Sequence, residues 1–80
     1  MNLYVGNFVY TTTESELKKM FAKQGSVVSV RIIHDQFTRA SKCFGYVQMQ
    51  TNNGGNQAID RLHGKKMNDR SLVVKKAKRI

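Results

Sequence analysis

One segment of eight residues carries most of the chemistry in this chain: residues 42–49, Lys-Cys-Phe-Gly-Tyr-Val-Gln-Met. In a β-strand successive side chains point to opposite faces, so Lys42, Phe44, Tyr46 and Gln48 are expected to share one face. The residues between them are apolar or glycine, as expected for the buried side of a strand. Aromatic rings on the wet side suit a flat ligand, and a cation beside them suits an anionic one. Nucleobases on a phosphate backbone meet both requirements.

The segment resembles the first ribonucleoprotein signature of the RNA-recognition motif family, K/R-G-F/Y-G/A-F-V-x-F/Y. The positions that match outright are Lys42, Phe44, Gly45 and Val47. Tyr46 replaces Phe conservatively, whereas Cys43 stands at the Gly position and Met49 at the last aromatic position. Residues 3–8, Leu-Tyr-Val-Gly-Asn-Phe, resemble the family's other signature, about 40 residues upstream as the family has it. The resemblance extends over essentially the whole chain.

The order of predicted elements is β-α-β-β-α-β. Thr13 and Glu16 form a capping box before the first helix, and Thr51 is a plausible N-cap for the second. Gly25 and Gly64 are the expected helix stops. The predicted strands span about residues 2–6, 27–33, 42–49 and 71–76, and the two helices lie between these caps and glycine stops. This order predicts one α+β domain over residues 1–80, a ferredoxin-like fold with a four-stranded antiparallel sheet and two helices on one face. The resemblance implies the strand order 4-1-3-2.

The composition favours a polyanionic partner. The chain has 80 residues and a formal net charge of +9, and residues 61–80 hold eight cations against one anion. The single cysteine excludes an internal disulfide. No apolar run approaches the length of a membrane span, which is about 18 residues. The first residues lack the pattern of a secretory signal. We therefore expect an intracellular, cytoplasmic protein that does not enter a membrane.

The resemblance implies that single-stranded RNA binds on the open face of the sheet, by stacking of bases on Tyr4, Phe44 and Tyr46. Lys42 and Arg31 flank these rings and are candidates for phosphate contacts. Gln48 and Asn2 are candidates for hydrogen bonds to base edges. The remaining phosphate candidates leave the last strand beside the centre of the sheet and are Lys75, Lys76, Lys78 and Arg79.

Several alternatives stay open at this stage. The same fold would serve as a protein-interaction module whose aromatic residues bind a partner's helix or tail. Single-stranded DNA is an alternative ligand, because stacking and charge do not separate it from RNA. An acylphosphatase-like enzyme would need an Arg between the first strand and the first helix, and residues 7–13 contain no Arg or Lys. No metal-ligand spacing or catalytic triad stands out, so we expect a monomeric, non-enzymatic protein without a cofactor.

Three residues in or near the hairpin segment 34–41 carry separate expectations. Cys43 is expected to face the helices and to be structural, because a buried cysteine behaves as a small hydrophobe. Phe37 is either a partial staple over the edge of the sheet, the preferred reading, or an extra stacking ring. Arg39 stands where the family's loop commonly has Gly. Arg39 therefore either adopts a positive φ angle at a steric cost or gives the loop a different bend.

Overall fold

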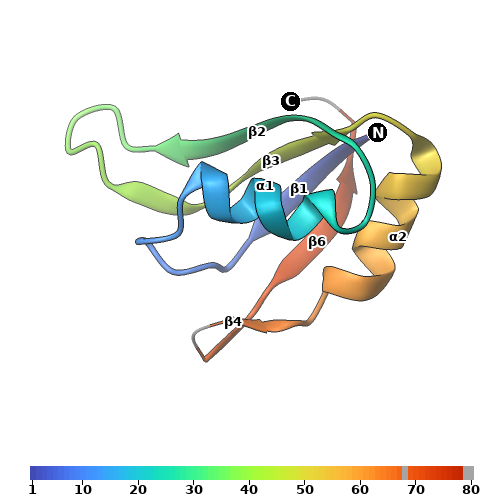
Figure 1. The fold of residues 1–80 in the computed structure, drawn as a ribbon. Coiled ribbons are helices and arrows are strands. Elements are labelled where there is room, and N and C mark those ends of the chain that lie inside the picture. The colour runs from blue at the N-terminus through green and yellow to red at the C-terminus, as the bar shows by residue number, and fades with distance from the viewer. Residues whose placement is uncertain (68, 79–80) are drawn as a thin grey trace.

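The computed structural model describes residues 1–67 and 69–78. It contains two helices, α1 (Glu14–Ala22) and α2 (Asn52–Leu62). The strands are β1 (Asn2–Gly6), β2 (Val27–His34), β3 (Ser41–Met49), β4 (Lys66–Met67), β5 (Arg70–Ser71) and β6 (Val73–Ala77). The main sheet has four strands in the order β2-β3-β1-β6, and every neighbouring pair is antiparallel (Figure 1). With β6 as the fourth predicted strand, the expected β-α-β-β-α-β fold and strand order are confirmed.

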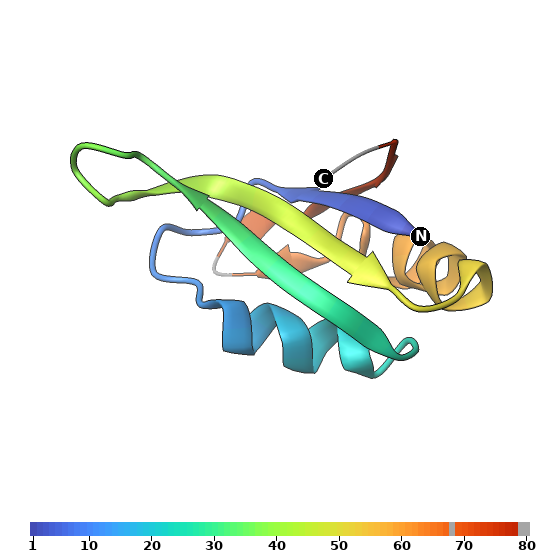
Figure 2. The same ribbon diagram turned by 90° about the horizontal axis from the view of Figure 1, so that it is seen from above.

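The core lies between the sheet and the two helices, which pack on the same side of it (Figure 2). The sheet contributes Leu3, Val5, Ile32, Val47, Met49 and Val74. Leu17 and Phe21 come from α1, and Ala58 and Leu62 from α2. Full burial of a Leu or Phe side chain stabilises the fold by about 1.5–3 kcal/mol. The other face of the main sheet carries neither α1 nor α2.

The cap of each helix forms at its predicted residue. Thr13 Oγ1 accepts a hydrogen bond from the backbone N–H of Glu16 (3.1 Å), and Thr51 Oγ1 accepts one from Gly54 (3.0 Å). Gly64 follows α2 with a φ of 83°, as a glycine that ends a helix commonly does. These side-chain oxygens satisfy backbone donors that have no partner within the helix.

The role expected for Gly25 is wrong. The chain leaves α1 through Lys23 with helical dihedral angles, and Gly25 is not among the residues with positive φ. Instead, a β-carbon on Gly25 would lie 2.9 Å from Gly54 Cα. Gly25 is therefore needed because the loop after α1 and the first turn of α2 meet backbone to backbone.

The segment before the last strand differs from the prediction, which began that strand at residue 71. Residues 70–71 instead pair with β4 in a small hairpin, and Asp69 in its turn has a φ of 66°. Leu72 closes the base of the hairpin, because its N–H donates to Lys65 O (2.9 Å) and its carbonyl accepts from Gly64 N (2.7 Å). These local hydrogen bonds delay the start of β6 to Val73.

Candidate nucleic-acid interface

The strand register aligns four side chains in one row across the open face of the sheet. Tyr4 lies directly opposite Tyr46 on one side and Lys75 on the other, and Tyr46 lies opposite Arg31. Directly opposite residues of an antiparallel pair project from the same face. Tyr4 lies between the buried Leu3 and Val5, so this face is the one away from the core. The row therefore places two tyrosines between two cations.

Two further rows flank the first. On the side of the β2–β3 hairpin, Gly6 lies opposite Phe44 and Val73. On the other side the row consists of Ser29, Gln48, Asn2 and Ala77. The Ser29 hydroxyl donates to Gln48 Oε1 at 3.5 Å. Asn2 and Gln48, which were predicted from the sequence, are thus neighbours on the predicted face, and Ser29 is a contact that sequence reasoning missed.

Three aromatic rings form a contiguous surface on this face, which we call the aromatic platform: Tyr4, Phe44 and Tyr46. The centroids of Tyr4 and Phe44 are 5.8 Å apart with an interplanar angle of 28°, a stacked arrangement. Tyr46 meets Tyr4 at 6.0 Å and 70°, and Phe44 at 6.3 Å and 89°. Such offset and edge-to-face pairs are favourable for aromatic rings. All three rings are half-buried, so they support one another and still present surface to solvent.

Gly6 provides the space that the Tyr4 ring occupies. A β-carbon on Gly6 would lie 2.6 Å from Tyr4 Oη and 2.9 Å from Tyr4 Cε1, closer than atoms in contact approach. Sequence reasoning did not single out Gly6. The signal was present, since a glycine two residues after a tyrosine shares its face of a strand.

Gly45 provides space as well, in this case for the backbone of the neighbouring strand β2. It is buried opposite Ile32, and a β-carbon there would collide with the backbone carbonyl oxygen of Arg31 and lie 2.9 Å from Ile32 Cα. The glycine between Phe44 and Tyr46 therefore lets β2 approach β3 closely.

A β-bulge interrupts β3 just before Phe44. Between the pairs Ile32↔Gly45 and His34↔Ser41, β3 contains two more residues than β2, and Cys43 has a φ of 64°. The Cys43 N–H donates to Ser41 Oγ (3.1 Å). Cys43 is half-buried and packs against the core, as predicted. Simple alternation, however, does not extend across the bulge to Lys42.

The positive charge of Lys42 acts on Asp35 in the β2–β3 hairpin, where it is one of the groups that lower the pKa of the Asp35 carboxyl. The larger causes are the backbone N–H groups of Thr38 and Phe37, each of which donates to Asp35 Oδ1 at 2.9 Å. Arg39 has a φ of 66°, so it adopts the conformation that glycine would tolerate better.

The preferred interpretation of Phe37, a staple over the sheet, is wrong. Its side chain is 85% exposed, and the hairpin projects away from the helices (Figure 1). The turn built on Asp35 holds residue 37 in the loop between β2 and β3, outside both strands.

The cations of the last strand do not share one face. Lys75 lies opposite Tyr4. Lys76 lies opposite the fully buried Leu3, so its position in the register is on the face of the sheet that the helices cover. Of these two lysines, only Lys75 therefore has the register of the platform face. Lys78 is exposed just beyond β6, and Arg79 lies outside the described residues.

Neither helix of the described ranges 1–67 and 69–78 is long and apolar enough to span a membrane. In the same part of the chain, no group of three or more His, Cys, Asp or Glu residues is arranged to hold a metal ion.

Comparison with known proteins gives a consistent result. The family described as RNA recognition motif matches residues 3–73. The putative RNA-binding protein RbpE of Nostoc sp. is 37% identical over 98% of this chain and 79% of its own length. The chloroplastic RNA-binding protein CP33 of Arabidopsis thaliana is 38% identical over 90% of this chain, but the match covers only 22% of that relative.

Solved structures agree with these sequence relatives. The crystal structure of RNA binding protein PG1 superposes with a TM-score of 0.96 and 38% identity, covering 100% of this chain and 96% of that one. The RNA-recognition motif of Rna15 with bound RNA (GU) has a TM-score of 0.87 at 20% identity, covering 98% of this chain and 83% of that one. At that identity the second likeness supports the fold alone.

Proposed function

Since this chain belongs to the RNA recognition motif family, we propose that it binds single-stranded RNA across the open face of its sheet. The observation that carries this proposal is the aromatic platform, three mutually packed rings on a face that neither helix covers. Stacking of a base on an aromatic side chain contributes about 1–3 kcal/mol and tolerates any sequence, because every base has a π-face. Two or three bases would lie on Tyr4, Phe44 and Tyr46.

The cations at the two ends of the central row would hold the backbone of the bound strand. Arg31 and Lys75 are separated by three strand-to-strand steps, roughly 14 Å at the usual spacing. Phosphates on either side of the stacked bases would reach one or both of them. Lys42 and Lys78, and Arg79 from outside the described residues, would add affinity. Phosphate contacts position the strand without reading its sequence.

The row that contains Ser29, Gln48 and Asn2 supplies the groups that would read base edges. Gln48 and Asn2 carry amides with both donors and acceptors, and Ser29 holds Gln48 through its hydroxyl. The Ser29 contact restrains the Gln48 amide before binding, so less side-chain entropy would be lost when it meets a base.

The proposal is tested by fluorescence anisotropy with a labelled random single-stranded RNA and a DNA of matched length. Phe44→Ala should weaken RNA binding by about 1–3 kcal/mol, and Phe44→Ala/Tyr46→Ala by more. The matched control is Tyr10→Ala, which removes an aromatic side chain that is 74% exposed and outside the three rows. Equal affinities of the wild type and the double variant for RNA would refute the stacking site. Equal affinity for RNA and DNA would remove 2′-hydroxyl contacts from the proposal.

Several sequence expectations concern the whole protein and stay predictions. They are the monomeric state, the absence of enzymatic activity and the cytoplasmic location. The name of the relative CP33 places that protein in the chloroplast. Membership of this family therefore does not by itself indicate a cytoplasmic location.

A further inference from the structure

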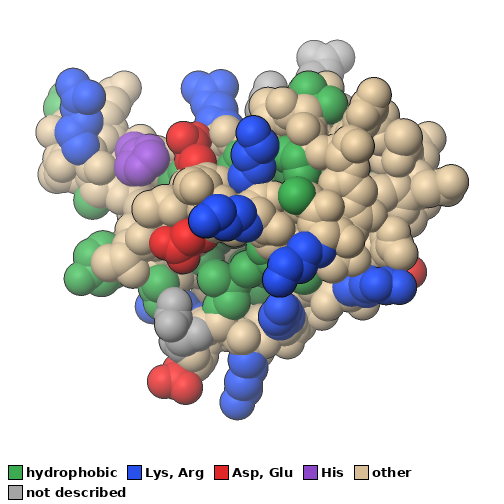
Figure 3. All heavy atoms as spheres, viewed as in Figure 1, with side chains coloured by type: hydrophobic (Ala, Val, Ile, Leu, Met, Phe, Trp, Pro, Cys, Tyr) green, Lys and Arg blue, Asp and Glu red, His purple; other side chains and the backbone are tan. Residues whose placement is uncertain are grey.

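A groove with an apolar floor lies on the side of the molecule opposite the aromatic platform. It runs between α1, the end of α2 and β4, and its floor contains Met20, Leu62 and Met67. Figure 3 views this side of the molecule and shows hydrophobic surface among lysine and arginine side chains. Leu62 is buried, whereas Met20 and Met67 are half-buried and pack against the edge of the core. The floor thus extends the core to the surface of the molecule.

The two methionines make the floor adaptable. Methionine is unbranched and polarisable, and it is used where a surface must fit side chains of different shape. Met20 and Met67 are only half-buried, so part of this apolar floor can be reached from the groove. The floor is suited to one long apolar or aromatic side chain from a partner.

Three lysines surround this floor. Lys19 and Lys23 line it from α1 and just after that helix, and Lys65 lines it from the loop before β4. All three are exposed, and the backbone of Lys65 is held by hydrogen bonds to Leu62 and Leu72. The one acidic residue in the lining is Glu16, whose Oε1 accepts a hydrogen bond from the Thr13 hydroxyl at 3.3 Å. The groove therefore presents a positive rim that is complementary to an acidic partner.

The lining favours a peptide over a nucleic acid. None of its residues is aromatic, so a base would find no ring on which to stack. It also contains no arginine, the residue best shaped for bidentate phosphate contacts. The aliphatic and thioether groups of the floor suit an apolar side chain of a peptide. The lysines around the floor suit carboxylates on either side of that side chain.

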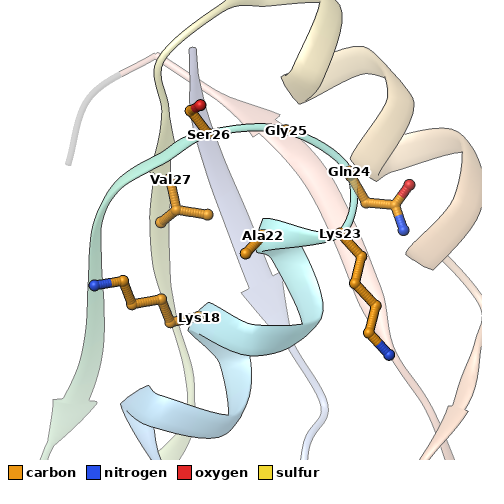
Figure 4. Close-up of a pocket in the computed structure, with 7 residues that line it drawn as sticks. All are labelled: Lys18, Ala22, Lys23, Gln24, Gly25, Ser26 and Val27. Atoms are coloured by element: carbon orange, nitrogen blue, oxygen red, sulfur yellow. The ribbon is translucent and has the colours of Figure 1, made fainter.

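A second hollow lies beside the groove but lacks its floor. It is formed by the last turn of α1 and the loop that leads to β2, between Lys18 and Lys23 (Figure 4). Its apolar lining consists only of Ala22 and Val27, so it offers no floor for a long apolar side chain. It is not part of the proposed site.

From this arrangement we infer that the groove between α1, α2 and β4 is a docking site for an acidic segment of a partner protein. The segment inserts one long apolar side chain between Met20, Leu62 and Met67, and its carboxylates pair with Lys19, Lys23 and Lys65. Because the groove and the platform lie on opposite sides of the sheet, a partner in the groove leaves the platform accessible. This inference does not depend on what binds at the platform.

The probe is a short fluorescein-labelled peptide of glutamates with one central Phe, measured by fluorescence anisotropy at moderate salt. Two control peptides carry Ser in place of the Phe, or Lys in place of the glutamates. The acidic Phe peptide should bind roughly tenfold more tightly than the Ser peptide, because only the former buries a large apolar side chain. The Lys peptide should not bind.

Matched protein variants separate the groove from the general positive charge of the chain. Lys19→Glu/Lys65→Glu should weaken the acidic Phe peptide roughly tenfold. Lys18→Glu/Arg70→Glu changes the net charge equally at exposed cations outside the groove lining, and should have a much smaller effect. The melting temperature serves as the folding control. Equal weakening by the two variants, equal binding of the Phe and Ser peptides, or no binding of the Phe peptide overturns the proposal.

Methionine-methyl NMR on the wild-type protein gives a readout that requires no variant to fold. The acidic Phe peptide should shift the methyl resonances of Met20 and Met67 and leave that of the buried Met49 unchanged. Shifts of Met20 and Met67 caused by single-stranded RNA instead would make the groove a nucleic-acid site and overturn the inference.

Discussion

Glu14, in the first turn of α1, accepts a hydrogen bond through Oε2 from the backbone N–H of Ile32 on β2, at 3.0 Å. Because β2 is an outer strand of the main sheet, this N–H points away from its strand partner and would otherwise need a solvent or side-chain acceptor. The bond joins α1 to β2 at Ile32, the residue that lies opposite Gly45, where β2 and β3 approach each other closely. One carboxylate thereby fastens the helix to the edge of the sheet.

Glu14→Ala should lower the free energy of unfolding by about 1–2 kcal/mol, because the part-buried N–H of Ile32 loses its acceptor. Glu14→Gln keeps an oxygen acceptor and should lose less. Urea denaturation of both variants measures the difference. If Ala and Gln are equally stable, the hydrogen bond contributes nothing beyond the charge.

Gly6→Ala tests the space beneath Tyr4. The added methyl group must displace the Tyr4 ring, so RNA binding should weaken by about 1 kcal/mol or more through loss of stacking. The double variant Gly6→Ala/Tyr4→Ala should bind no worse than Tyr4→Ala alone. An additive loss in this cycle, measured by anisotropy, would show that Gly6 acts independently of the ring.

Lys75 and Lys76 are adjacent in the chain and provide a matched pair on opposite faces of β6. Lys75→Gln should flatten the logarithmic dependence of RNA affinity on salt by roughly 0.7, the contribution of one phosphate on a single strand. Lys76→Gln should change the slope much less. Salt titrations of both variants decide the matter, and equal slopes would mean that register does not select the phosphate contact.

Arg39→Gly should raise the free energy of unfolding, by up to about 1 kcal/mol. A non-glycine residue at a φ of 66° pays a steric cost that glycine avoids, although glycine gains more entropy in the unfolded chain. Thermal denaturation provides the measurement. A destabilised variant would show that the Arg39 side chain makes a contact worth more than the backbone strain.

The β2–β3 hairpin should lose order in acid. The N–H groups of Thr38 and Phe37 hold the pKa of Asp35 below its ordinary value of 3.8. A depressed pKa in the folded state means that the ionised carboxylate stabilises the turn above the ordinary value. That contribution is lost as the pH falls through the depressed pKa. The amide NMR shifts of Phe37 and Thr38 should therefore titrate with a midpoint below 3.8. In Asp35→Asn this titration should vanish, and a midpoint above 3.8 would contradict the geometry.

Features that depend on residues a few positions apart were predictable from the sequence. The caps at Thr13 and Thr51 satisfy donors within one helical turn, so they can be recognised from local spacing alone. The rings of Phe44 and Tyr46 share a face because they are two residues apart in one strand. The resemblance to a family then supplied the strand order that brings Tyr4 beside them, as the structure has it.

Other features depend on how distant segments meet, and only the tertiary structure decided them. The bulge at Cys43 and the pairing of Lys76 with Leu3 follow from the register between strands, which alternation along one strand does not specify. The methionine and lysine groove needs α1, α2 and β4 side by side. The contact of Gly25 with Gly54 joins backbones 29 positions apart, where a β-carbon would intrude. A glycine looks the same in a sequence whether it ends a helix or admits a neighbouring chain, and only packing distinguishes the two.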